Sequence, residues 1–440
     1  MSNTLEGLDI TNYQALNSTE IRGKILKVVS EAFLRLDPEK LLGGCIKEIL
    51  SGAREYRNVY VVGFGKASLK MYRGIRDRTS QIAKYSAVII PEGEKVIDNY
   101  PELEILMGNH PVPSRETLFS SRKILESIGE LHNDDLVIVL ISGGGSALFE
   151  IPEEGYTIEK IGETAKCLMD YGADINELNA VRKTMSQVKG GKLARKLYPS
   201  EVYAFIISDV PGDNLSVIAS GPLTRTEINA ETLDHIVEKY GEKCGLPAKE
   251  DLVRHSGQTD VEYFRNVTTR VILKNSDFVN LMSTLLLESG EKVSALEHPV
   301  TGDVEETAQW FARKMRSQFE ITGGPVWIVS GGETTVKVSG NGKGGRNSEL
   351  ALRVALNMGS EEKFLFAGIG TDGIDGTSPA MGGITDTSFL ERCKKSEILN
   401  SLSMSDSYTL LNKYNSAIIT GYTGTNVSDI YIAYYAGTGE

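Results

Sequence analysis

The stretch LVIVLISGGGSAL, residues 136–148, begins with six aliphatic residues and continues through Ser142 into three consecutive glycines. An apolar run of this kind is typical of a strand that is covered on both faces in a parallel sheet. Gly143, Gly144 and Gly145 follow at once, so a tight turn is expected where the strand ends. In open α/β sheets, ligands bind beyond the carboxyl ends of the strands. The stretch therefore predicts a parallel α/β sheet with a binding loop at its edge.

Strands and helices alternate on both sides of this stretch. Pro38 is expected to interrupt a helix over residues 19–50, and Gly190 with Gly191 to interrupt a helical region over residues 158–197. Such alternation predicts an α/β fold whose sheets are parallel or mixed and sandwiched by helices. The other expected strands are 59–62, 86–90, 103–107, 202–208, 270–273, 293–296, 326–330, TTVKV at 334–338 and 363–369, and the other expected helices are 114–131, 276–287, 303–319 and one from Asn347.

The length of 440 residues predicts more than one domain. Residues 241–266 are polar and lack a strong hydrophobic period, so the boundary is placed there. The predicted domains are residues 1–265, which contain the glycine loop after residue 142, and residues 266–440.

Composition excludes several classes of protein. The formal net charge is −12 and no dense Lys/Arg run occurs, which argues against a nucleic-acid partner. No apolar run approaches the ~20 residues that span a membrane. The start, MSNTLEGLDITNYQ, lacks the pattern of a signal peptide. A cytoplasmic protein is expected.

The cysteines and histidines predict no metal or redox site. Cys45, Cys167, Cys244 and Cys393 are far apart, without a C-x-x-C pair. They are expected to be free thiols in a reducing compartment. The five histidines form no H-E-x-x-H pattern.

The turn GFGKAS, residues 63–68, follows the first expected strand. Gly63 and Gly65 resemble the start of a dinucleotide fingerprint, but Ser68 stands where a third glycine is needed. Lys66 gives the turn a different reading, because a lysine at a helix start can join backbone amides around one phosphate or carboxylate. A solvated lysine on a structural turn remains the alternative.

The loop of Ser142, Gly143, Gly144, Gly145 and Ser146 is predicted to bind an anion. Three glycines let backbone amides converge on one group, and the dipole of a following helix would add to the attraction. No G-K-[ST] sequence follows, so the loop is not a Walker A motif.

Asp209 follows the expected strand 202–208. A carboxylate at a strand end can bind a metal ion or accept a hydroxyl proton. Aspartates also commonly cap turns, and both interpretations stay open here.

The densest polar region lies in the second half of the chain. Glu333 belongs to SGGETT, which we interpret as a turn after a strand, and Gly344, Gly345, Arg346 and Asn347 precede a helix. A guanidinium at a helix start gains nothing from the dipole, so Arg346 is expected to serve a ligand. Two Asp-Gly pairs, which begin at Asp372 and Asp375, fit either polar contacts or hairpin turns.

Together these features favour phosphoryl transfer. The reaction needs amides and cations around phosphates, and carboxylates for Mg²⁺ and for the attacking hydroxyl. It needs no nucleophilic triad, and the sequence offers no histidine or cysteine constellation for one.

Eight motifs in order resemble one family. They are GFGKAS, GNHPVPS, ISGGGSAL, NAVRKTMSQVKGGKLA, SDVPGDNLSVIASGP, SGGETTV, GKGGRNSELAL and GTDGIDG, and they lie between about residue 55 and the C-terminus. The chain thus resembles the class II glycerate 2-kinases, which join a Rossmann-like glycerate-kinase N-terminal domain to a MOFRL domain. The resemblance implies transfer of a phosphoryl group from ATP to the C2 hydroxyl of D-glycerate, with Mg²⁺, in a cleft between the domains.

The resemblance also assigns roles to residues. Lys66 and Arg346 would hold the substrate or the transferring phosphate, and Asp209 would orient or deprotonate the hydroxyl. Asn179 and Lys189 are implied as secondary contacts, and Glu333 and Asp372 as contacts on the metal or nucleotide side. The resulting expected substrate and nucleotide contacts are Gly63, Gly65, Ser142, Gly143, Gly144, Gly145, Ser146, Asn179, Lys189, Glu333, Gly344, Gly345, Asn347 and Asp372, with Asp209 and Asp372 as expected metal ligands.

Two other functions are weighed against the kinase. Relatives of this family have been labelled hydroxypyruvate reductases, but the missing glycine and the missing ribose-binding acid argue against NAD. A sugar-acid sensor that binds without turnover would use the same residues. Small molecules, D-glycerate and ATP, are the expected partners, and a homo-oligomer is left open.

Overall fold

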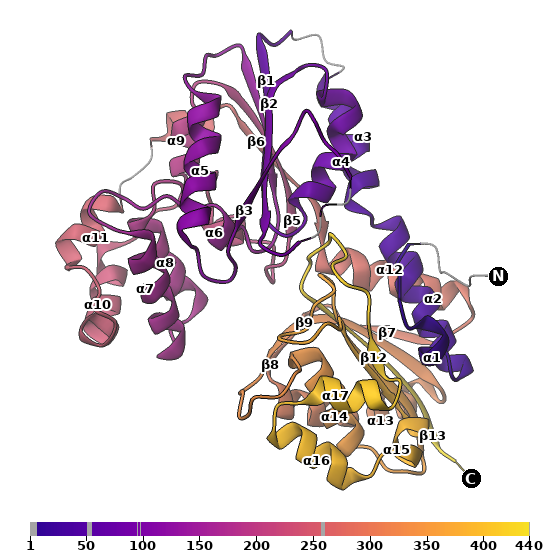
Figure 1. The fold of residues 1–440 in the computed structure, drawn as a ribbon. Helices are drawn as coiled ribbons and strands as arrows, with labels where there is room; N and C mark the ends of the chain where they lie inside the picture. The colour runs from indigo at the N-terminus through magenta and orange to yellow at the C-terminus, as the bar shows by residue number, and fades with distance from the viewer. Residues whose placement is uncertain (1–6, 51–54, 95, 97, 257–259, 440) are drawn as a thin grey trace. The chain divides into compact units, whose positions relative to one another are not determined.

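The computed structural model describes residues 7–50, 55–94, 96, 98–256 and 260–439. The chain forms two compact units. The central unit is Pro38–Leu273, and the terminal unit combines the segment before Pro38 with Lys274–Glu440. Both are α/β, as the sequence predicts (Figure 1).

The central unit contains a six-stranded sheet of order β3-β2-β1-β4-β5-β6. The pairs from β3 to β5 are all parallel. Helices α3 and α4 cover one face, and α5 and α9 the other (Figure 1). The strands are β1 Asn58–Phe64, β2 Ala83–Pro91, β3 Glu104–Gly108, β4 Asp135–Ile141, β5 Glu201–Ser208 and β6 Val267–Lys274.

The helices of this unit fall into two groups. Four of them, α7, α8, α10 and α11, pack around their own apolar core and form a helical subdomain. The others flank the sheet or lie in its loops. Their bounds are α3 Pro38–Leu50, α4 Ser68–Thr79, α5 Arg115–Ile128, α6 Gly145–Leu148, α7 Ile158–Asp170, α8 Ile175–Met185, α9 Lys192–Leu197, α10 Ala230–Cys244 and α11 Lys249–His255, with 3-10 turns at Ile218–Ser220 and Val261–Phe264.

The terminal unit contains a mixed sheet of order β12-β11-β10-β13-β9-β7, with β8 also paired to β9. Helices α13 and α14 cover one face, and α2 and α12 the other (Figure 1). The strands are β7 Val293–Ala295, β8 Val300–Asp303, β9 Val326–Thr335, β10 Glu362–Gly370, β11 Gly382–Asp386, β12 Ala417–Ile418 and β13 Asp429–Thr438. The helices are α1 Tyr13–Leu16, α2 Glu20–Arg35, α12 Asn275–Glu288, α13 Val304–Thr322, α14 Arg346–Leu356, α15 Thr387–Arg392, α16 Lys395–Ser403 and α17 Ser407–Lys413.

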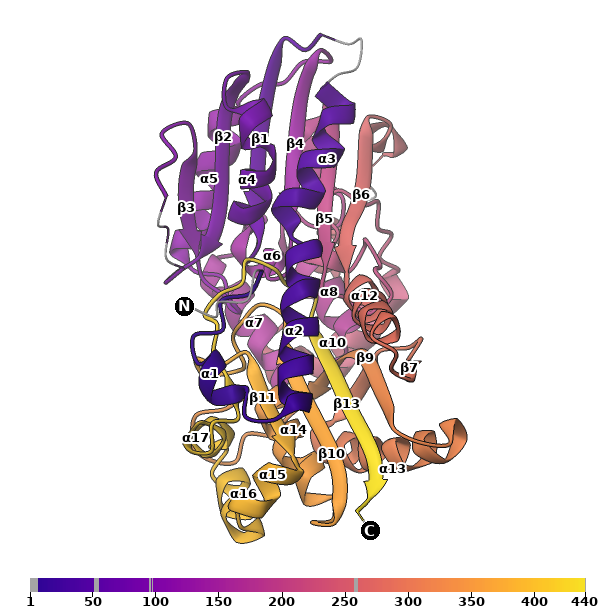
Figure 2. The same ribbon diagram turned by 90° about the vertical axis from the view of Figure 1, so that its right-hand side faces the viewer.

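The N-terminal helix α2 groups with the terminal unit rather than with the residues that follow it, which differs from the predicted division at residue 265. Arg22 is fully buried and donates from Nε and Nη2 to the two carboxylate oxygens of Asp386, at 2.7 and 2.9 Å. Its Nη1 donates to the backbone O of Asn415, and Nη2 also donates to Ser416 Oγ. Figure 2 shows α2 running beside the terminal sheet. A buried charge is stable only when paired in this way, so the pair fixes where α2 packs.

The interpretation of SGGETT as a turn is wrong. Gly331 and Gly332 lie inside β9, which continues to Thr335, so TTVKV is not a separate strand. A Cβ atom on Gly331 would overlap the Asn275 side chain, and one on Gly332 would overlap the backbone of Val300. The two glycines therefore permit close packing within the sheet.

Two of the four expected free thiols are joined. Cys167 on α7 and Cys244 on α10 form a disulfide, which links two helices of the helical subdomain. Cys45 and Cys393 are free, as predicted. None of the helices among the described residues combines the length and the hydrophobicity that a membrane span requires.

Candidate active site

The predicted loops of the central unit lie at one edge of its sheet. In register, Phe64 of β1 pairs with Ile141 of β4, and Ile141 pairs with Ile206 of β5. Lys66, Ser142 and Asp209 therefore follow neighbouring parallel strands at the same end. In the order β3-β2-β1-β4-β5-β6, the chain adds strands on one side of β1 and then on the other, so the order of the strands reverses between β1 and β4. Nucleotide-binding sheets of this type hold their ligands at that point.

The loops after β1 and β4 interlock at Gly65. The amide of Lys66 donates to the Gly143 carbonyl, and the amide of Ala67 donates to Ser142 Oγ, both at 2.9 Å. Gly65 has φ +121°, and a Cβ atom there would overlap both Oγ and the carbonyl of Ser142. Only glycine fits this close approach. Gly63 packs against Val88 within the sheet, so its contact is structural.

The loop of residues 142–146 turns at Gly144, which has φ +81°. A Cβ atom on Gly144 would lie 3.0 Å from His110 Cδ2 and 3.4 Å from Lys66 Cγ, so the His110 ring and the Lys66 stem both border the loop. The helix that follows, α6, has four residues. It is too short for a substantial dipole, so the expected contribution from a following helix is wrong.

Ser146, Ser220 and Asn179 form a chain of hydrogen bonds from this loop to α8. Ser220 Oγ donates to Asn179 Oδ1 at 2.9 Å and lies 2.9 Å from Ser146 Oγ. Because the single Ser220 proton is used on Asn179, Ser146 donates to Ser220. Ala219 and Ser220 have φ of 49° and 61°. Left-handed backbone at non-glycine residues is strained and is often found at functional sites.

Lys189, an expected secondary contact, lies in a buried ion pair. Its Nζ is 2.8 Å from Glu150 Oε2, both side chains are 1% exposed, and it also donates to the Phe149 carbonyl. Burial lowers the pKa of Lys189, and Glu150 works in the opposite direction. The pair anchors the segment after α6.

The two expected metal ligands belong to different units. Asp209 directly follows β5 in the central unit. Asp372 in the terminal unit accepts a hydrogen bond from the Ile374 amide, as an aspartate that shapes a turn does. Among the described residues, no group of three or more histidine, cysteine or acidic side chains could hold a metal ion.

Arg346 begins α14, as predicted, and lies between two acids. Its Nε is 2.6 Å from Asp429 Oδ2, its Nη2 donates to Asp429 Oδ1 at 3.1 Å, and its Nη1 donates to Glu333 Oε1 at 2.6 Å. Burial alone would lower the pKa of Arg346, but Asp429 and Glu333 raise it. Burial raises the pKa of Asp429 to about 6, against the opposing effect of Arg346.

The first turn of α14 is closed by Asp375 on the connection between β10 and β11. Its carboxylate accepts the amides of Asn347 and Ser348, at 3.0 and 2.8 Å, and the Asn347 side chain donates to Asp429 at 3.0 Å. A Cβ atom on Gly345 would overlap Asp375, and one on Gly344 would overlap Ser407. These glycines therefore allow close packing. The backbone amides at the start of α14 already donate to the Asp375 carboxylate.

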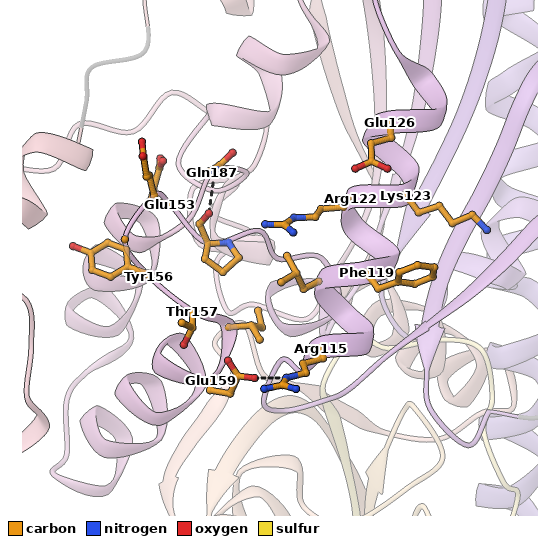
Figure 3. A pocket seen from close by; sticks show the side chains of 15 residues that line it. Arg115, Phe119, Arg122, Lys123, Glu126, Glu153, Tyr156, Thr157, Glu159 and Gln187 are labelled. Carbon is orange, nitrogen blue, oxygen red and sulfur yellow. Dashed lines mark hydrogen bonds and ion pairs between the residues drawn. The ribbon is translucent and has the colours of Figure 1, made fainter.

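A broad surface hollow lies elsewhere in the central unit, between α5 and residues 152–159 (Figure 3). Arg115 there donates to Glu159 at 2.7 Å, and Gln187 donates to the Pro152 carbonyl. None of the predicted site residues lines it. The candidate site remains the set of loops at the strand ends, which lies apart from this hollow.

Sequence reasoning left several residues of these sites without a role. His110 and Ser220 lie in motifs quoted for the family resemblance, and those motifs were the available signal. Asp375 stands in GTDGIDG, and Asp429 stands in the last apolar strand. Only the tertiary fold brings Asp375 and Asp429 to Arg346.

Comparison with known proteins identifies the family. A family described as "Domain of unknown function (DUF4147)" matches residues 24–251, and the MOFRL family matches residues 326–429. A glycerate 2-kinase of Picrophilus torridus is 42% identical over 97% of this chain and 99% of its own length. A D-glycerate 2-kinase of Thermotoga maritima is 34% identical over 92% of this chain and 96% of its own.

The solved structures agree with the sequence matches. The crystal structure of glycerate kinase from Thermotoga maritima superposes with a TM-score of 0.82 at 32% identity, over 94% of this chain and 99% of that one. Nearly the whole of both units is thus shared with these relatives. The chain belongs to the family of glycerate 2-kinases that join a DUF4147 domain to a MOFRL domain.

Proposed function

We propose that the protein transfers the γ-phosphoryl group of ATP to the C2 hydroxyl of D-glycerate, giving 2-phosphoglycerate and ADP. The observation that carries the proposal is the near full-length similarity to proteins named glycerate 2-kinase, at 42% identity for one of them. The loops beyond β1, β4 and β5 support it, because they gather glycine amides, Lys66 and Asp209 at one sheet edge.

In the central unit, the loop of residues 142–146 and Lys66 hold anionic oxygens. Backbone amides and a mobile ammonium suit charge that builds up on a phosphoryl group during transfer. Asp209 orients the glycerate hydroxyl and accepts its proton as the oxygen attacks phosphorus.

In the terminal unit, Arg346 contacts the transferring phosphate. Three of its five N–H groups are used on Asp429 and Glu333, which leaves two for phosphate oxygens among the described contacts. The carboxylates hold the guanidinium plane in one orientation, as phosphoryl transfer requires.

Mg²⁺, when bound, would neutralise negative charge on the phosphates during transfer. Mg²⁺ in kinases is commonly held by one or two carboxylates together with the phosphates, so the lack of a three-acid cluster among the described residues fits this arrangement. Asp209 and Asp372 are the proposed protein ligands. We further propose that the protein acts in the cytoplasm, where ATP and Mg²⁺ are both available.

The test is ADP release by the purified protein with ATP, Mg²⁺ and D-glycerate, with L-glycerate and EDTA as controls. Release that requires both D-glycerate and Mg²⁺ is expected. Oxidation of NADH by hydroxypyruvate would favour a reductase, and glycerate binding without ADP release would favour a sensor; either result contradicts the kinase.

A further inference from the structure

One face of α8 presents two buried donors that nothing in the described structure accepts. Asn179 and Lys183 are one helical turn apart, so their side chains share a face. Asn179 is 3% exposed and its Nδ2 has no hydrogen-bond partner. Lys183 is 6% exposed, and among the described residues its ammonium makes no hydrogen bond or ion pair.

The charges around this face do not balance. Arg182 and Lys189 both interact with Glu150, and Glu150 is already paired with Lys189. Lys192 is paired with Glu153 and also donates to the backbone O of Lys183. Lys183 therefore has no carboxylate of its own. Burial of a cation without a partner is costly, and burial lowers the pKa of Lys183 to about 8.

Two contacts place this face against the loop of residues 142–146. Asn179 Oδ1 accepts from Ser220, which is bonded to Ser146 of the loop. The stem of Lys183 packs against Gly190, where a Cβ atom would lie 3.3 to 3.5 Å from the lysine's Cβ, Cγ and Cδ atoms. Gly190 in turn donates its amide to the Ser220 carbonyl. Asn179 is thus linked to the loop through Ser220 alone, and the stem of Lys183 is linked to it through Gly190 and Ser220.

We propose that Lys183 and Asn179 bind the carboxylate of the acceptor substrate. An ammonium and an amide offer N–H groups to the two oxygens of one carboxylate, and a charge-assisted hydrogen bond would supply the missing partner. The inference rests on the proposed function and explains how the enzyme would select hydroxy acids over polyols. Polyols without a carboxylate would leave the buried ammonium unpaired, and such sites reject them strongly.

The same donors could in principle take a phosphate of ATP, since both ligands present anionic oxygens. Steady-state kinetics distinguishes these two ligands, because the KM for each substrate is measured separately. Lys183→Met removes the charge and keeps an apolar stem that suits burial, so the fold should be retained. Lys183→Arg keeps the charge, and Lys243→Met removes an exposed lysine on α10 as the matched control.

Steady-state kinetics with D-glycerate and ATP test the inference. For Lys183→Met, the KM for D-glycerate should rise by about 100-fold, because one hydrogen bond from a charged group is lost. The KM for ATP should stay within a factor of about 3 of the parental value. Asn179→Ala should raise the KM for D-glycerate by about 10-fold. Discrimination against glycerol should fall in both variants, Lys183→Arg should recover part of it, and Lys243→Met should match the parent protein.

A pH series separates a binding role from a structural one. As the parent protein loses the Lys183 proton above about pH 8, its KM for D-glycerate should rise, whereas Lys183→Arg should stay flat. A higher KM for ATP alone would assign the donors to the nucleotide and overturn the proposal. Unchanged constants in a folded Lys183→Met would also overturn it.

Failure of the proposed function would look different. If the parent protein bound D-glycerate in calorimetry without phosphorylating it, the kinase assignment would fall, and loss of that binding in Lys183→Met would still support the carboxylate site.

Discussion

Arg346, the first residue of α14, lies against Asp429, the first residue of β13, through two contacts of 2.6 and 3.1 Å. Asp429 is 1% exposed. The pair fixes the guanidinium at the helix start, where the dipole would otherwise oppose it. A cation held by a buried acid is already oriented and could meet a phosphate without reorganising. Substitutions at Arg346 can therefore separate its structural pairing with Asp429 from the catalytic role that we propose for it.

Arg346→Lys should keep a cation beside Asp429 but lose the planar fork. We expect kcat to fall by about 100- to 1000-fold with little change in melting temperature. Arg346→Ala should also lose about 3–5 kcal/mol of stability, because Asp429 is left buried without a cation.

The stability of Arg346→Ala should depend on pH. Burial raises the folded-state pKa of Asp429 above its value of 3.8 in the unfolded chain. The variant should therefore be most stable below about pH 4 and lose stability as the pH rises through the folded-state pKa. Urea denaturation at pH 4.5 and 7.5 measures the free energy of unfolding of Arg346→Ala relative to Arg346→Lys. A larger loss of stability at pH 4.5 than at pH 7.5 would contradict the prediction.

Lys66→Ala should lower kcat by about 100- to 1000-fold while the protein stays folded. Lys66 lies in the loop before α4 and borders the loop of residues 142–146 through its stem, whereas Lys70 lies in the first turn of α4. Lys70→Ala is thus the matched control and should keep the parental rate. More than about a tenth of parental activity in Lys66→Ala would remove Lys66 from the mechanism.

Gly65→Ala should cost about 3 kcal/mol of stability and most of the activity, because the new Cβ overlaps Ser142 at a left-handed position. Gly93 also has positive φ, of +89°, but nothing lies within 4 Å of its Cβ position. Gly93→Ala therefore isolates the cost of the backbone angle, about 1 kcal/mol. Equal denaturation midpoints for the two variants would show that the loops do not interlock at Gly65.

The disulfide between Cys167 and Cys244 predicts the thiol count. Unfolded without reductant, the protein should show two reactive thiols of its four cysteines, and four after reduction. The bond closes a loop of 77 residues, so its reduction should lower stability by about 4 kcal/mol in the chain-entropy account. Four thiols in the unreduced protein would show that the bond does not form.

The fold class was predictable because its signals are local. The strand before Ser142 and the alternation around it follow from short-range hydrophobic patterns. Gly331 and Gly332 misled the prediction because they lie inside β9, where the lack of a side chain leaves room for Asn275 and Val300. Both partners are more than 30 residues away in the sequence, so no local pattern indicates them. The pairing of Arg22 with Asp386, 364 residues apart, is likewise a tertiary contact.

The candidate site divides in the same way. Lys66 and the loop of residues 142–146 were found because glycines and a strand end mark them together. The sequence marked Asp375 only as part of an Asp-Gly pair that fits polar contacts or a hairpin turn. Its partners on α14, like those of Asp429, are set by the tertiary fold. Lys189, expected from its motif as a secondary contact, is paired with Glu150, and this buried partner could not be read from the motif.

The central claim is tested most directly by phosphorus NMR of the product formed from ATP, Mg²⁺ and D-glycerate. The account predicts the signal of 2-phosphoglycerate, growing in step with ADP, and growing about 100- to 1000-fold more slowly in Lys66→Ala. A signal of 3-phosphoglycerate would contradict transfer to the C2 hydroxyl, and the absence of any phosphorylated acid would contradict the kinase.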